Sequence, residues 1–153
     1  MSTTPFKKIS DIAAELHSRM QAITVAQGCE TDIGARVFRG RRNVDETHVP
    51  CVVIIEGSDS TNDRPGRMPS ISVTQRFVLA AYLPCDPDNP NDAAHAAVRD
   101  IKRALFRDGG RWGGKVLGLT YQRRDIGPRA DGRPIVFVTV DIDVDYVEDL
   151  TDP

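Results

Sequence analysis

Three aspartates near the end of the chain are the residues whose type and spacing best suit chemistry: Asp141, Asp143 and Asp145. In an extended strand, alternate side chains share one face and lie about 6.5–7 Å apart. Carboxylate oxygens at this spacing suit a hard cation, and a metal-dependent nuclease could use them. The glycine and distal glutamate of an EF-hand loop are missing, and no histidine or cysteine lies nearby in the sequence. We therefore interpret the row as an acidic stripe that faces solvent or a partner. We expect no catalytic residue, metal or cofactor.

A cluster of arginines early in the chain forms the second chemical feature: Arg36, Arg39, Arg41 and Arg42. Arginines in such a cluster can bind phosphates. Only Phe38 is interleaved with them, however, and acidic residues resume at Asp45 and Glu46. Salt bridges to another protein, or to a second copy of this chain, are the more economical interpretation. We take these four arginines as a candidate assembly interface.

The single tryptophan lies in a glycine-rich loop, DGGRWGG, at residues 108–114. The loop matches neither the GxxxxGK[ST] nor the GxGxxG phosphate-binding pattern, and it follows a helix rather than a strand. Trp112 either folds back onto the end of that helix or is offered to a neighbouring subunit. Both alternatives stay open, and Trp112 is kept as a candidate interface residue.

The element that must position the acidic row is a long strand, PIVFVTVDIDVDY, at residues 134–146. Its even-numbered side chains are all apolar, whereas its odd-numbered side chains change from apolar to acidic halfway along. Alternation with a period of two predicts a strand with one fully buried face. The rest of the chain must supply the cover for that face.

The remaining periodicities predict two amphipathic helices and further strands. Between the second and third strands lies a long polar loop at residues 57–70, which we expect to project from the body. The expected fold is α+β, with a largely antiparallel sheet packed by two helices in two layers and one domain over residues 1–153. The predicted helices span 6–26 and 90–107. Residues 34–42 are predicted to form a short strand followed by an exposed turn or arm, and the other predicted strands span 51–55 (central in the sheet), 70–83, 115–126 and 134–147.

Composition is ordinary for a soluble globular chain of 153 residues, with 40% hydrophobic residues, 27% charged residues and a formal net charge of −2. This balance gives no global reason to expect nucleic-acid binding. The three cysteines are too scattered for a disulfide framework or a metal site, so we expect reduced thiols in a cytosolic setting. We expect no signal peptide and no membrane span, because no apolar run approaches about 20 residues.

Four segments in this order resemble tail terminator proteins of long-tailed, siphovirus-type bacteriophages and prophages. They read DIGARVFRGRR, VPCVVIIEG, AAVRDIKRALF and LTYQRRDIGPRADGRPIVFVTVDIDVDYVEDL, and the resemblance covers roughly residues 5 to 150. It implies α/β or α+β subunits that form a hexameric ring on the tail tube and stop the tube from polymerising. It also implies a surface for the head-completion or neck proteins, and no catalytic residues.

The resemblance also implies where the protein acts. It would be assembled in the host cytoplasm and lie in the virion, at the head-tail junction, where genomic DNA passes through the ring without sequence-specific binding. In such a ring the acidic stripe would face the lumen or a partner. Two alternatives stay open: another neck or tail-completion protein, and a small DNA-handling protein or metal-dependent nuclease that uses the acidic stripe.

Overall fold

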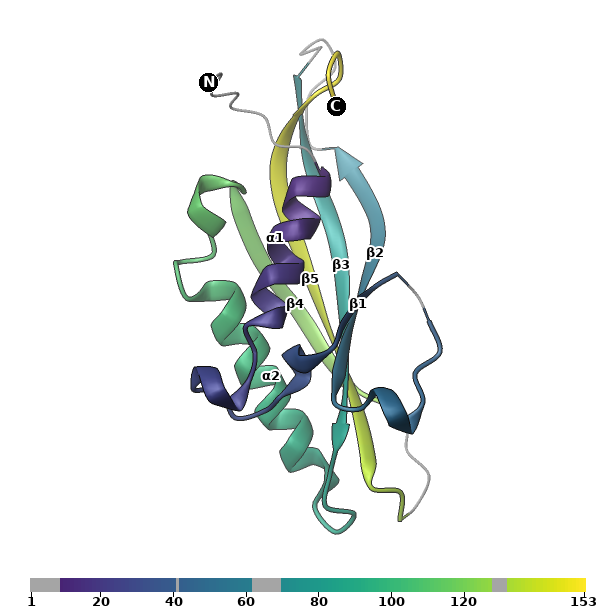
Figure 1. Cartoon of the computed structure of the whole chain (residues 1–153). Helices are drawn as coiled ribbons and strands as arrows, with labels where there is room; N and C mark the ends of the chain where they lie inside the picture. The colour runs from purple at the N-terminus through teal and green to yellow at the C-terminus, as the bar shows by residue number, and fades with distance from the viewer. Residues whose placement is uncertain (1–8, 41, 62–69, 128–131) are drawn as a thin grey trace.

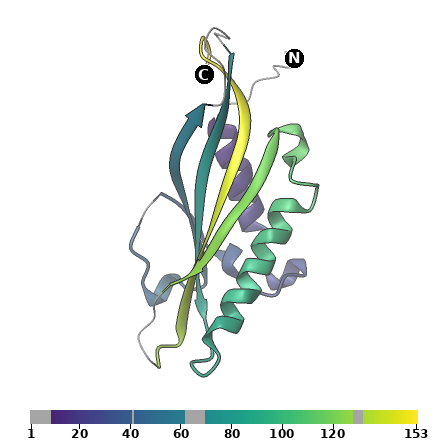
Figure 2. The ribbon, with the colours of Figure 1, turned by 180° about the vertical axis from the view of Figure 1, so that it is seen from behind.

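One five-stranded sheet carries both helices on the same side. The computed structural model describes residues 9–40, 42–61, 70–127 and 132–153. The strand order is β1-β2-β3-β5-β4, and Figures 1 and 2 show the sheet from its helix side and from its helix-free side. The elements are α1 (Ile9–Gln21), β1 (Val37–Arg39), β2 (Cys51–Thr61), β3 (Ser70–Pro84), α2 (Pro90–Phe106), β4 (Gly118–Ile126) and β5 (Ile135–Asp149), with short 3-10 turns η1 (Val25–Gln27), η2 (Ile33–Ala35), η3 (Glu46–His48) and η4 (Trp112–Gly114).

The predicted fold class is confirmed. β2 with β3, β3 with β5 and β4 with β5 all pair antiparallel, and only β1 with β2 is parallel. The even-numbered face of β5 packs under the helices, and its six apolar side chains are at most 2% exposed: Val136, Val138, Val140, Ile142, Val144 and Tyr146. β5 lies between β3 and β4, so this one strand supplies the middle of the core.

The first helix is shorter than its pattern predicts. It ends at Gln21 rather than near residue 26, and its predicted first residues, 6–8, lie outside the described residues. Thr24 is already extended, with φ −138° and ψ 152°, within a run of β-branched residues that disfavours a helix. Gly34 folds back onto the helix end and donates its backbone N–H to the Ile23 carbonyl oxygen at 2.8 Å. A Cβ at Gly34 would lie 2.3 Å from the Met20 carbonyl oxygen, so only glycine allows this approach.

The predicted loop at residues 57–70 is partly strand. β2 continues to Thr61, with an irregularity between Glu56 and Asp59, and β3 begins at Ser70. The sequence does not predict this extension, because residues 56–61 are polar, exposed and carry no apolar face. Residues 62–69 lie outside the described residues. β2 is also an interior strand beside the short edge strand β1, and β3 takes the middle of the sheet instead.

The remaining predicted elements lie close to their expected positions. The short strand predicted within residues 34–42 is β1, and the turn η2 precedes it. β4 begins at Gly118 rather than Lys115, because the end of the glycine-rich loop takes up the intervening residues. α2 matches its prediction closely and buries Ala94, Ala97, Ile101 and Leu105 against the sheet.

Candidate functional site

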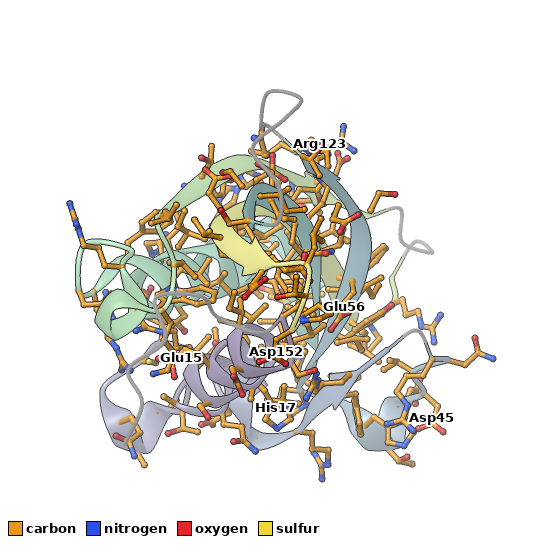
Figure 3. All side chains as sticks on the ribbon, turned by 90° about the horizontal axis from the view of Figure 1, so that it is seen from above. Glu15, His17, Asp45, Glu56, Arg123 and Asp152 are labelled. Carbon is orange, nitrogen blue, oxygen red and sulfur yellow. The ribbon has the colours of Figure 1, made fainter. Side chains whose placement is uncertain are left out.

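The acidic row lies on the helix-free face of the sheet, as the alternation predicts, but it is already paired within the chain. The Arg123 Nε lies 3.0 Å from Asp141 Oδ2, and Asp141 is only 7% exposed. Figure 3 shows Arg123 on the side of the sheet away from α1. The Arg76 Nε and Nη2 atoms donate to the two carboxylate oxygens of Asp143 at 2.9 and 3.2 Å. Two of the three carboxylates are therefore paired with arginines, so the row is less exposed and carries less net negative charge than the sequence predicts.

Cross-strand register explains this pairing. Arg76 lies directly opposite Asp143 on β3, and Arg123 lies opposite Asp141 on β4. Opposite charges on directly opposed residues attract across a sheet. The hydrogen bond to Asp143 raises the pKa of Arg76 above its ordinary value.

The polar partners of the row make it a poor metal site. The Gln122 Nε2 also donates to Asp143 at 2.8 Å, and the Thr74 Oγ1 donates to Asp145 at 2.6 Å. These donors occupy the oxygens that a cation would need. Within the described part of the chain, no group of three or more histidine, cysteine, aspartate or glutamate side chains is placed to hold a metal ion.

Replacing Asp141, Asp143 and Asp145 together by asparagine should leave the chain folded, because asparagine keeps the volume and part of the hydrogen bonding. We expect neither the wild type nor the variant to cleave DNA. The measurement is cleavage of double-stranded and single-stranded DNA with added Mg²⁺ or Mn²⁺, alongside circular dichroism of both proteins. Metal-dependent cleavage by the wild type that disappears in the variant would restore the nuclease alternative.

The arginine cluster is spread over an exposed arm rather than gathered at one point. Arg36 is exposed beside η2, and the Arg39 Nη2 lies 3.7 Å from Glu56 Oε1, so part of the charge of Arg39 is balanced by β2. The Arg42 guanidinium carbon lies 4.1 Å from the centre of the Phe38 ring, a cation–π contact that fixes its direction. Arg41 lies outside the described residues.

Beside this arm the helix-free face of the sheet is hollowed. The hollow has a volume of about 450 Å³ and is lined by Arg42, Asn43, Val53, Ile55, Ala80 and Tyr82. The Tyr82 ring stacks on Phe137, with centroids 5.2 Å apart. Burial raises the pKa of the neighbouring Cys51 thiol to about 11, so at neutral pH this thiol is protonated and unreactive. The arrangement suits contact with a partner rather than chemistry.

Trp112 does not belong to an interface. It is 0% exposed, and its Nε1 donates to the Leu105 carbonyl oxygen at 3.0 Å. Trp112 itself has a positive φ of 52°, and Gly113 beside it has φ 66°, so the backbone turns sharply enough to fold the ring back onto α2. The prediction of Trp112 as an interface residue is therefore wrong, and the other alternative, packing on the helix end, is correct.

A buried arginine holds this loop, and sequence reasoning missed it. Arg19 is 4% exposed, and its guanidinium carbon lies 5.3 Å from the centre of the Trp112 ring. Its Nη2 donates to Asp108 Oδ2 at 2.9 Å and its Nη1 donates to the Ala104 carbonyl oxygen at 3.0 Å. The Arg19 hydrogen bond lowers the pKa of Asp108 below its ordinary value. The signal was present, because Arg19 follows Leu16 by three residues on the apolar stripe of α1.

Asp100 is a second missed residue. It lies in α2 and is 0% exposed. Its carboxylate accepts hydrogen bonds from the backbone N–H groups of Glu30 and Thr31 at 2.8–3.1 Å. The Thr31 Oγ1 adds a further hydrogen bond at 2.7 Å. This carboxylate therefore fixes the segment between η1 and η2 against α2. Its place three residues after Ala97, on the apolar stripe, was the signal for a buried role.

Comparison with known proteins finds similarity in fold. No protein-family model matches the chain, and no curated protein matches it in sequence. Among solved structures, a chain of the "Virion of native gene transfer agent (GTA) particle" is similar, with a TM-score of 0.54 and 13% sequence identity. The similarity covers 88% of this chain and 92% of that chain. At this identity it shows a shared fold. None of the helices in the described residues is both long and apolar enough to span a membrane.

Proposed function

We propose that this chain is a structural protein of a phage-like virion, and that it is the tail terminator. The observation that carries the proposal is the shared fold with a subunit of a gene transfer agent virion over nearly the whole length of both chains. The sequence resemblance over residues 5 to 150 points to the same class of protein. The chain would act at the head-tail junction, after assembly in the host cytoplasm.

In this role the chain binds copies of itself in a hexameric ring, the tail tube protein, and the head-completion or neck proteins. A ring built head-to-tail needs two different surfaces on each subunit. The two layers of the fold offer such surfaces, because both helices cover one side of the sheet (Figures 1 and 2) and Arg42 lines the hollow on the other side. The hollow beside Arg42 is a candidate contact for a neighbouring protein.

The paired acidic row supports a place along the path of DNA for the β5–β4 side of the helix-free face, away from the edge strand β1. Asp141 and Asp143 are balanced by Arg123 and Arg76, so the face carries both signs of charge in alternation. A surface of this kind offers no continuous positive stripe for phosphates to bind. Genomic DNA would therefore pass over it without sequence-specific binding, as a ring lumen requires.

The test is assembly with tail tube protein. Purified chain should form a closed ring of six subunits in light scattering or native mass spectrometry. Added to polymerising tail tube protein, it should stop growth and shorten the tubes seen by negative-stain microscopy. A chain that forms rings and binds neck proteins without changing tube length would instead be another neck or tail-completion protein. A chain that stays monomeric and leaves the tubes unchanged would refute both roles.

Reversing Arg39, Arg41 and Arg42 to glutamate should weaken ring formation, most visibly at low salt, where screening is least. Each exposed pair contributes only about 0.2–1 kcal/mol, so the three reversals are needed together. Arg124→Glu on β4 is the matched control for a change of charge away from the arm. Rings of normal mass and tubes of normal length with the triple variant at low salt would show that the arm is not an assembly contact.

A further inference from the structure

The loop that joins α2 to β4 presents an apolar side chain to solvent. Leu117 is 65% exposed, compared with 55% for Val25 and 39% for Leu150, the other exposed large hydrophobic side chains among the described residues. Its backbone N–H donates to the Asp145 carbonyl oxygen at 2.8 Å, and Val116 beside it is 5% exposed. The buried Trp112 fixes the same loop. Leu117 is therefore held outward by a rigid support, as an anchor residue in an interface would be.

The loop that carries this exposed leucine is mainly basic in sequence. Residues 107–117 contain three basic residues and one acidic residue, Asp108, which is bound by Arg19. The Lys115 ammonium lies 3.5 Å from Glu15 Oε2, whereas Arg107 and Arg111 are exposed. An exposed leucine on a mainly basic loop suits an apolar hollow flanked by carboxylates.

The opposite end of α2 supplies such a hollow. It has a volume of about 330 Å³ and is lined by Pro84, Cys85, Asp86, Asn89, Asp92 and Ala93. Residues 84–93 contain three aspartates and no basic residue. Proline, cysteine and alanine contribute apolar surface to the hollow, and Asp86 and Asp92 contribute carboxylates. The charged residues of this segment are opposite in sign to most of those in the loop that carries Leu117.

We propose that Leu117 of one copy of this chain enters the hollow at the start of α2 in a second copy, with Arg111 facing Asp92. The segments before and after α2 lie at opposite ends of the helix (Figure 1). The hollow is lined by the first of these segments and Leu117 lies in the second, so no copy can fill its own hollow. The contact is heterologous and adds copies head-to-tail, which closes into a ring when the rotation allows. It rests on the self-assembly part of the proposed function and adds one specific contact to it.

The first test changes Leu117. Leu117→Glu should weaken association between copies at least roughly tenfold, because it removes an apolar side chain that becomes buried in the contact and places a carboxylate near Asp86 and Asp92 of the second copy. Val25→Glu is the matched control, since Val25 is also exposed and should leave association unchanged. Association is measured by sedimentation velocity over a range of concentrations, with circular dichroism to verify folding. Association of Leu117→Glu equal to that of the wild type would overturn the proposal.

The second test uses charge exchange. Arg111→Glu alone should weaken association, and adding Asp92→Arg in the same chain should restore part of the loss. Restoration identifies the pair as a contact, because two independent defects would add. If the loss of association in the double variant equals the sum of the losses in the two single variants, Arg111 and Asp92 do not contact each other in the interface.

The third test uses the native thiol in the hollow. Cys85 is a free cysteine, so Leu117→Cys should form a disulfide with Cys85 of a second copy when copper(II)-phenanthroline and dissolved oxygen oxidise the two thiols. A ladder of linked copies is expected on a non-reducing gel, and it should disappear in Leu117→Cys with Cys85→Ser. Val25→Cys should give no ladder. A ladder that persists without Cys85 would contradict the proposal.

The outcomes separate this inference from the proposed function. If the wild type forms rings and caps tubes while Leu117→Glu does the same, only the contact between Leu117 and the hollow is wrong. If the wild type neither associates nor shortens tubes, the proposed function itself is refuted.

Discussion

Trp112→Ala should lower the free energy of unfolding by about 3–5 kcal/mol, the range for removing a large aromatic side chain from a packed core. The ring is 0% exposed, joins α1 to the loop after α2 and donates a hydrogen bond to Leu105. Its loss would leave a cavity and also release Arg19 from its cation–π contact. Because Trp112 is the only tryptophan, unfolding must be followed by circular dichroism in urea rather than by tryptophan fluorescence.

Trp112→Phe is the matched control for that change. It keeps an aromatic ring in the core but loses the hydrogen bond to Leu105, so a smaller loss of about 1–2 kcal/mol is expected. A Trp112→Ala variant that unfolds at the urea concentration of the wild type would show that the loop does not depend on this side chain. It would also weaken the inference that Leu117 is held on a rigid support.

Asp100→Ala should lower the free energy of unfolding by about 3–5 kcal/mol, because it leaves the part-buried N–H of Glu30 and the buried N–H and hydroxyl of Thr31 without an acceptor, at about 1–3 kcal/mol for each buried donor. The carboxylate is 0% exposed, so water cannot replace it without local opening. Denaturation in urea measures the loss, and amide exchange at residues 30 and 31 should become faster.

Two variants test whether the hydrogen bonds cause this effect. Asp100→Asn keeps the volume and one acceptor oxygen, so its loss should lie between the wild type and Asp100→Ala. Asp88→Ala removes an exposed carboxylate just before the same helix and should change stability by no more than about 0.5 kcal/mol. Asp100→Ala within 1 kcal/mol of the wild type would mean that the segment between η1 and η2 is held by other contacts.

The sequence predicts the parts of this fold that depend on local periodicity. The alternation along β5 and the stripe of α2 follow from side-chain direction within one element, so both were predicted with nearly correct limits. The extent of α1 was not predictable in this way, because its end depends on Gly34, which contacts the helix only after the chain turns back.

Side-chain partners were less predictable because they depend on register between distant segments. Asp143 meets Arg76 only because β3 and β5 pair as they do, and the two residues are 67 positions apart. Asp100 and Thr31 are similarly distant. The sequence alone offered an acidic row and a charged residue on an apolar stripe, and it could not indicate which partners would satisfy them.

The continuous pairing of β3 with β5 sets the length of the molecule. Fifteen residue pairs run from Ser70 opposite Asp149 to Pro84 opposite Ile135, and at about 3.3 Å per residue this ladder is roughly 50 Å long. The subunit is therefore elongated along its strands, and its two ends can contact different neighbours without any flexible linker. Each residue of a strand adds a fixed rise, so two residues added to each strand would increase the distance between the two ends of the ladder by about 7 Å. The same residues added to a loop would not change that distance.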